Sequence, residues 1–244
     1  MTFSPSSKAR LTGHDLGRFP GATLFDRLAR AVCRAGCLPR KELYEAWEVA
    51  RRIRRRLRGG RIVDVAGGHG LLGHVLLLLD DSSPVAVVAD PAIPPSARTL
   101  HAALVDAWPR LGGRVVFESA SLDAIALTNS DLVVSIHACG DLTDRVIARA
   151  ADARARIAVL PCCHDKATCE VGPLAGWLDT DVAIDVMRAV GLEARGYQVQ
   201  TFVIPAAITP KNRLLVADLP ATVVGSPARY DCTGTTISQP AKKP

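Results

Sequence analysis

Hydrophobic residues along this chain fall into short β-type runs that alternate with longer segments of helical spacing. The short runs occupy residues 62–65, 85–89, 114–117, 131–136 and 156–160. Segments with helical spacing lie between them, at residues 71–79, at residues 96–108 and in a stretch that continues to residue 151. Short apolar runs separated by helices are typical of strands that are buried in a parallel sheet. The pattern therefore predicts an α/β fold.

The C-terminal part of the chain departs from this alternation. A helix is predicted at residues 181–190 with Gly191 as its end, and strands follow at residues 197–204 and 213–217. Only a turn separates these two strands, so they must pair in antiparallel fashion. The complete pattern predicts a Rossmann-like, seven-stranded, mostly parallel sheet with a C-terminal antiparallel hairpin and helices on both faces.

Two further helices precede the first strand, at residues 22–36 and 41–57. We therefore expect an N-terminal helical extension over residues 21–58 and a main domain over residues 59–220. A chain of 244 residues with 48% hydrophobic content is large enough for one such domain with a sizeable core.

The two ends of the chain have a different composition. Residues 1–20 are rich in Ser, Gly and basic residues and predict a flexible arm, and residues 221–244 predict a disordered tail. The longest apolar run, residues 75–79, is far too short to span a bilayer, and the seven cysteines are an odd number. We therefore expect a soluble, cytoplasmic protein with reduced thiols.

The segment at residues 61–73 reads RIVDVAGGHGLLG, a strand that enters a glycine-rich turn and then a helix. Glycines allow positive φ angles and let a ligand approach the backbone closely. The unpaired N–H groups at the start of the helix attract a carboxylate or a phosphate. The alternative is a turn that only packs the helix on the sheet.

Two classes of cofactor use such a turn. Gly68, Gly70 and Gly73 match the GxGxxG fingerprint of dinucleotide sites. S-adenosylmethionine sites place an acid two residues before the first small residue of the turn, as Asp64 stands before Ala66. A carboxylate there attracts the ammonium group of the cofactor's methionine part but would repel a pyrophosphate, so Asp64 favours S-adenosylmethionine.

Acids further along the chain agree with a nucleoside ligand. Asp90 ends the second strand, where an acid can bind the two hydroxyls of a ribose, although it could also only open a surface turn. Leu122 and Asp123 follow the third strand, where an acid can accept the amine of an adenine or cap a helix.

Two polar clusters follow the fourth and fifth strands, at residues 137–144 and 161–166. Ligands of open α/β sheets bind at the carboxyl ends of the strands, so both clusters should face the same crevice as the glycine-rich turn. The residues that could hold zinc are Cys139, Cys162, Cys163, His164 and Cys169. Because adjacent cysteines lack the usual finger spacing, we expect no metal. A nucleophilic thiol activated by a histidine and plain pocket packing are the alternatives.

With these motifs, residues 38–219 resemble a class I S-adenosylmethionine-dependent methyltransferase. Within that superfamily the chain resembles the methyltransferase-like group that includes the tRNA ribose 2′-O-methyltransferase domain and the methyltransferase domain of glutathione-S-transferase C-terminal-domain proteins. The residues that carry the resemblance are His137-x-Cys139-Gly140-x-x-Thr143-Asp144 and Pro161-Cys162-Cys163-His164.

The resemblance implies a cofactor site and a set of catalytic candidates. The methionine end of S-adenosylmethionine would contact Asp64, Ala66, Gly67, Gly68 and Gly70. The rest of the cofactor would contact Asp90 at the ribose, Leu122 and Asp123 at the adenine, and His137 beside the sulfonium. His164 or Asp165 could take the proton of a hydroxyl acceptor, and Cys162 could shape the acceptor pocket.

The acceptor is a separate question. The net charge is +6, and six arginines lie within residues 51–58, where they could hold RNA phosphates or form a solvated helix face. The chain lacks the zinc-finger RNA-binding module of the tRNA enzymes, so a small-molecule or protein acceptor is also open. An NAD-dependent oxidoreductase and a non-catalytic cofactor-fold binding module are the other function classes.

Overall fold

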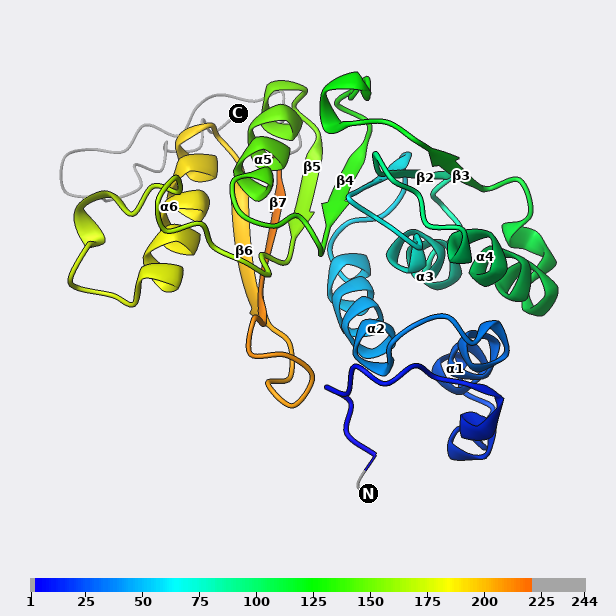
Figure 1. Cartoon of the computed structure of the whole chain (residues 1–244). Coiled ribbons are helices and arrows are strands. Elements are labelled where there is room, and N and C mark those ends of the chain that lie inside the picture. Colours follow the sequence, from blue (N-terminus) through cyan, green and yellow to red (C-terminus); the bar gives the residue numbers. More distant parts are fainter. Residues whose placement is uncertain (1–2, 221–244) are drawn as a thin grey trace, which may run out of the picture.

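A computed structural model, which describes residues 3–220, shows a seven-stranded sheet with the order β3-β2-β1-β4-β5-β7-β6 (Figure 1). Its strands are β1 (Ile62–Val65), β2 (Ala86–Ala89), β3 (Val115–Glu118), β4 (Leu132–Ser135), β5 (Arg156–Val159), β6 (Gln198–Val203) and β7 (Arg213–Asp218). Strands β1 to β5 are parallel, and β7 pairs in antiparallel fashion with both β5 and β6. The predicted fold class is confirmed.

Helices cover both faces of this sheet. They are α1 (Leu24–Ala35), α2 (Arg40–Arg54), α3 (Leu71–Leu79), α4 (Ser96–Ala107), α5 (Leu142–Asp152) and α6 (Thr180–Ala194). Helices α1 to α4 lie together on one side of the sheet, and α5 and α6 lie on the other (Figure 1). Alternate side chains of a strand point to opposite faces, so Ile62 joins the core under α1 to α4 and Val63 joins the core under α5.

The segment before α1 packs against the helices, in contrast to the expected flexible arm. Leu11 and Phe19 are buried in the core, and the Leu11 N–H donates to the Leu38 carbonyl at 2.9 Å. The Arg40 guanidinium stacks over the Phe3 ring, 3.4 Å from its centroid. A few buried apolar residues anchor this otherwise polar segment. The average composition of the segment does not reveal them, so it predicted a flexible arm. The predicted disordered tail, residues 221–244, lies outside the described residues.

Helix α6 continues past the glycine that was predicted to end it. Gly191 lies inside the helix, which extends to Ala194, and the first left-handed φ after the start of α6 is that of Gly196, at +85°. Leu192 is buried against the sheet, so packing of the last turn outweighs the weak helix propensity of a single glycine. The true end signal is therefore Gly196.

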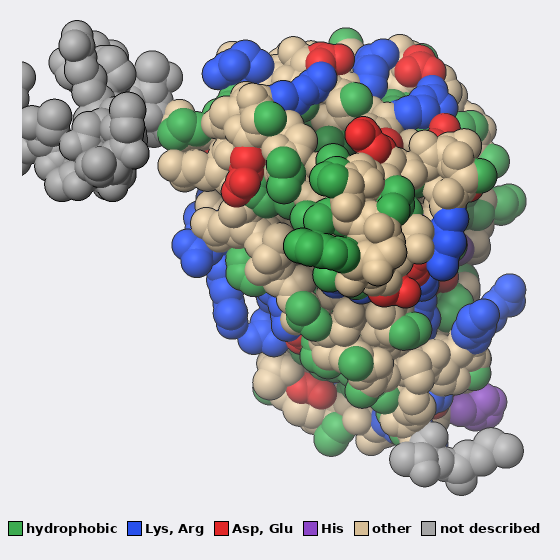
Figure 2. Space-filling model, turned by 90° about the vertical axis from the view of Figure 1, so that its left-hand side faces the viewer, with side chains coloured by type: hydrophobic (Ala, Val, Ile, Leu, Met, Phe, Trp, Pro, Cys, Tyr) green, Lys and Arg blue, Asp and Glu red, His purple; other side chains and the backbone are tan. Residues whose placement is uncertain are grey.

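The face of the molecule on the side of α6 is partly apolar, with hydrophobic side chains gathered near its centre (Figure 2). Among the described residues, the large exposed hydrophobic side chains are Val116, Trp177, Leu178, Val190 and Val203. Four of these five belong to α6, the loop before it or β6. No helix within residues 3–220 is long and apolar enough to cross a membrane.

Truncating Leu11 tests whether the N-terminal segment is part of the core. Leu11→Ala should lower the free energy of unfolding by about 2–5 kcal/mol, because it removes a fully buried side chain. Val116→Ala, at a side chain that is 42% exposed, is the matched control and should have a much smaller effect. Urea unfolding of the two variants measures both, and an unchanged Leu11→Ala midpoint would show that the segment is loose.

Candidate functional site

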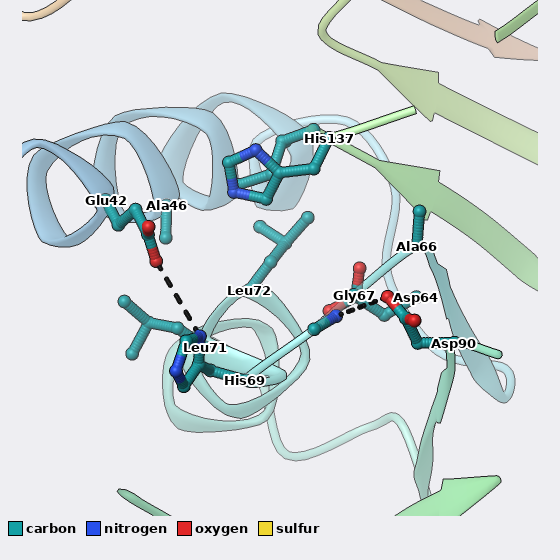
Figure 3. Close-up of a pocket in the computed structure, with 12 residues that line it drawn as sticks. Glu42, Ala46, Asp64, Ala66, Gly67, His69, Leu71, Leu72, Asp90 and His137 are labelled. Carbon is teal, nitrogen blue, oxygen red and sulfur yellow. Dashed lines mark hydrogen bonds and ion pairs between the residues drawn. The ribbon is translucent and has the colours of Figure 1, made fainter. Parts of the chain in front are cut away.

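A cavity of about 290 Å³ lies at the carboxyl ends of β1, β2 and β4, under the N-terminal half of α2 (Figure 3). Its walls are Glu42, Ala46, Asp64, Ala66, Gly67, Gly68, His69, Leu71, Leu72, Asp90, Ile136 and His137. The glycine-rich turn thus lines this cavity, at the edge of the sheet where open α/β folds bind their ligands. We call it the turn pocket.

The backbone of the turn requires small residues. Gly70 has a φ of +72°, and a Cβ atom there would come within 2.6 Å of the Val88 side chain. Ala66 also adopts a positive φ, 54°, a conformation that costs a non-glycine residue some strain. The Ala66 N–H donates to the Ala89 carbonyl at 2.9 Å, which anchors the turn to β2. The turn is therefore held close to the sheet and leaves its outer side open.

Asp64 lies at the bottom of the turn pocket and is only 1% exposed. Its Oδ2 accepts a hydrogen bond from the Gly73 N–H at 3.1 Å. Its Oδ1 is buried and has no hydrogen-bond partner within residues 3–220. Burial raises the pKa of this carboxyl to about 7. An unpaired buried carboxylate is costly, so this oxygen is suited to a cationic ligand group.

Asp90 lies beside Asp64 on the same wall of the turn pocket (Figure 3). Its Oδ2 accepts from the Gly68 N–H at 3.1 Å, and its Oδ1 accepts from the Ala92 N–H at 2.9 Å. The two bonds fix the carboxylate, and each oxygen keeps a second lone pair for a ligand hydroxyl. The Asp90 carboxylate therefore holds the glycine-rich turn through Gly68 and still faces the pocket.

Helix α2 supplies a wall that the sequence did not indicate. Glu42 points from α2 towards His69 across the turn pocket, with 4.0 Å between Glu42 Oε2 and His69 Nδ1 (Figure 3). Burial, followed by the nearby Glu45, raises the pKa of Glu42. Ala46 lies one helical turn further along the same face. No local motif marks these residues, because their role arises only when α2 docks beside the turn.

Two imidazoles line the turn pocket, and burial lowers the pKa of each. His69 Nε2 is 2.7 Å from the Ser96 hydroxyl, so this ring is engaged. The His137 ring makes no hydrogen bond to any residue of the described part of the chain and points into the pocket (Figure 3). Its lowered pKa keeps His137 neutral at neutral pH, so it can accept a proton.

The residues predicted for the adenine lie outside this cavity. Leu122 is buried in the core under α5. Asp123 is exposed and bonds Arg145 at 2.6 Å, with Arg149 at 3.6 Å. The adenine contacts of both residues stay a prediction.

The three predicted catalytic residues also lie outside the turn pocket. The His164 side chain is only 1% exposed, with Nε2 2.8 Å from Asp185 Oδ1 on α6, so the ring is closed off from an acceptor. Asp165 accepts a hydrogen bond from the Ala167 N–H at 2.9 Å, and bonds of this kind lower its pKa and weaken it as a base. Cys162 Sγ is 3.2 Å from Cys139 Sγ in a separate group of thiols.

Comparison with known proteins identifies the family. A family model described as a methyltransferase domain matches residues 41–170, which is more than half of the 244 residues. The chain belongs to this methyltransferase family. The match begins inside α2 and ends after the PCCH segment, so it includes every wall of the turn pocket. The resemblance inferred from the sequence is confirmed.

Solved structures similar to this methyltransferase share little sequence with it. The Bacillus subtilis m1A22 tRNA methyltransferase TrmK is 13% identical, with a TM-score of 0.48, covering 70% of this chain and 65% of that one. An O-methyltransferase family protein from Burkholderia thailandensis is 18% identical, with a TM-score of 0.49, covering 85% and 63%. The chain thus spans less than two thirds of either protein. No curated protein matches the chain.

Asp64 predicts a pH dependence of the stability of this methyltransferase. Its folded-state pKa of about 7 lies above that of an unfolded carboxyl, so folding favours the protonated acid. Wild-type stability contributed by this group is therefore present at low pH and is lost as the pH rises through 7. Asp64→Asn cannot titrate. Between about pH 5 and about pH 7, wild type should lose about 2 kcal/mol of unfolding free energy relative to Asp64→Asn.

Urea unfolding of the two ligand-free proteins across this pH range measures the effect. Any constant cost of the amide cancels, because only the change of the difference with pH is compared. If the two stability curves remain parallel, the buried carboxyl does not titrate in this window.

Proposed function

We propose that this protein transfers a methyl group from S-adenosylmethionine that is bound in the turn pocket. The observation that carries the proposal is the buried Oδ1 of Asp64, which lacks a partner within residues 3–220 and faces a pocket beside a helix N-terminus. The ammonium group of the cofactor's methionine part would supply the missing positive charge. Its carboxylate would be attracted to the free N–H groups of the turn and of α3.

Asp90 would accept the ribose hydroxyls at the other end of the same ligand. It lies at the carboxyl end of β2, one strand away from Asp64 in the sheet. Asp64 and Asp90 therefore hold opposite parts of one molecule across the turn. A dinucleotide fits less well, because its pyrophosphate would lie beside the Asp64 carboxylate.

The chemistry that we propose requires alignment and one proton acceptor. The bound cofactor would supply an electrophilic methyl group and leave as S-adenosylhomocysteine, whose sulfur keeps the electron pair of the broken bond to the methyl carbon. His137 lines the pocket and has a free, neutral ring, so it would accept the proton that a hydroxyl or amine acceptor loses as its oxygen or nitrogen bonds the methyl carbon. His137 thus takes the role that was expected of His164, whose ring is held by Asp185.

For the acceptor we propose RNA. Within the arginine run, Arg54 is buried and bonds the Leu76 carbonyl, and Arg52 bonds Glu48. Arg55 and Arg56 are exposed and form no ion pair within the described residues, so they are free to bind phosphates. Arg55 and Arg56 directly follow the end of α2 at Arg54, and Arg55 is nine residues beyond Ala46, which is about 14 Å at the helical rise. An RNA strand that follows α2 could span that distance to reach the pocket.

Binding of S-adenosylhomocysteine tests the cofactor assignment. Asp64→Asn and Asp90→Asn should each weaken binding by roughly 1–3 kcal/mol, because each replaces a protein carboxylate that accepts a hydrogen bond from the ligand with a neutral amide. Isothermal titration measures the loss, and thermal unfolding confirms that the variants are folded. Asp152→Asn, at an exposed acid at the end of α5 outside the turn pocket, is the matched control and should bind like wild type.

Two results would contradict the assignment. One is wild-type affinity in both folded pocket variants. The other is tight binding of NAD with no binding of S-adenosylhomocysteine, which would return the site to the dinucleotide class.

Charge reversal at the end of α2 tests the RNA proposal. Arg55→Glu with Arg56→Glu should weaken binding of a mixed tRNA fraction and reduce the salt dependence of that binding, because phosphate contacts are lost. Affinity for S-adenosylhomocysteine should be unchanged. The pair Arg34→Glu with Arg98→Glu alters the net charge equally at exposed positions on α1 and α4. If both pairs have the same effect, α2 has no specific part in RNA binding.

A further inference from the structure

Three thiols from two different loops converge at the carboxyl edge of the sheet. Cys139 follows β4, and Cys162 and Cys163 follow β5. Their sulfur atoms all lie within 4.8 Å of one another, and Cys139 Sγ is 3.2 Å from Cys162 Sγ. Cys139 and Cys163 are exposed and Cys162 is half-buried, so the group is open to solvent.

The sheet register brings these loops together. Ser135 of β4 lies opposite Val159 of β5, and each strand continues into its loop at the same edge. The Gly140 N–H donates to the Cys163 carbonyl at 3.2 Å, which ties the two loops to each other. Gly140 has a φ of +61°, a conformation that favours glycine in the bend after Cys139. The convergence of the thiols therefore follows from the fold.

The surroundings of the thiols do not suit a reactive nucleophile. A reactive cysteine needs a nearby cation to stabilise its thiolate. Within residues 3–220, no Lys or Arg side chain hydrogen-bonds any of these three sulfurs. Burial raises the pKa of Cys162, and its two thiol neighbours raise it further. What this group lacks is a positive charge at its centre, which a bound metal ion would supply.

We propose that Cys139, Cys162 and Cys163 form a binding site for a thiolate-preferring metal ion, Zn²⁺ or Cu⁺. Sulfur ligands lie about 2.3 Å from zinc, which places them about 3.8 Å apart in a tetrahedron. One sulfur pair is 3.2 Å apart and all three sulfurs lie within 4.8 Å of one another, so rotation of the two exposed side chains can bring them to this spacing. Three protein ligands suit Cu⁺ and leave a fourth position open on Zn²⁺.

This proposal departs from the expectation of no metal that was drawn from the ligand spacing, and that expectation is still to be tested. That expectation rested on ligand spacing along the chain, whereas the third ligand comes from a neighbouring strand, 23 residues before Cys162. The site is independent of the proposed methyl transfer. Cys139 is two residues after His137, which lines the turn pocket, so the proposed metal ligand and the pocket wall belong to the same loop.

The test uses the full-length protein, reduced and freed of metal. Competition with chromophoric chelators gives the affinity for Zn²⁺ and for Cu⁺ separately, and Co²⁺ reports thiolate ligands through its charge-transfer absorption. One equivalent of metal per chain is expected, with thiolate–cobalt absorption. Cys139→Ser, Cys162→Ser and Cys163→Ser should each weaken binding by at least about 100-fold, since even loss of a group behind a ligand costs up to that much.

Cys37→Ser is the matched control, because Cys37 is a half-buried thiol on the other side of the sheet. It should bind metal like wild type, and thermal unfolding without metal should show all four variants folded. The proposal is overturned if reduced wild type takes up less than about a tenth of an equivalent of either ion. It is also overturned if the triple serine variant binds as wild type does, or if the cysteines form only a Cys139–Cys162 disulfide whose reduction restores no metal binding.

Discussion

The buried carboxylate of Asp64 is the constraint on which the site depends. Asp64 is the third residue of β1, an interior strand of the sheet, it accepts a hydrogen bond from the N–H of Gly73 in α3, and the glycine-rich turn passes over it. Any side chain at Gly70 would displace the turn against Val88, so the turn has one way to close. Leaving one carboxylate oxygen unpaired is unfavourable in the free protein, and a cation in the pocket would remove that cost.

The N-terminal extension is part of this site rather than an appendage. Helix α2 packs on α3, and its first turns place Glu42 and Ala46 over the pocket. The arginine run begins in its last turn and continues past its end at Arg54, whose side chain donates to the carbonyl of Leu76 in α3. One helix therefore connects the turn pocket to exposed arginines, an arrangement that the proposed RNA acceptor would use.

Sequence patterns predicted the local elements well and the assembled site only in part. The apolar run of β1 and the turn into α3 carry their own signals, so Asp64, Gly68 and Asp90 could be predicted to share one pocket, while their contacts to a cofactor stay a prediction. Glu42 reaches the pocket only through helix docking, which no spacing encodes. The burial of His164 against acids of α6 likewise depends on tertiary packing. The approach of Cys139 to Cys162 agrees with the expectation that the loops after β4 and β5 meet at one edge of the sheet.

A crystal structure of the complex with S-adenosylhomocysteine tests the central claim most directly. The account predicts the amino nitrogen of the ligand at hydrogen-bond distance, about 2.7–2.9 Å, from Oδ1 of Asp64, with the ribose hydroxyls on Asp90. A ligand bound elsewhere, or one bound here with Oδ1 of Asp64 still unpaired, would contradict it.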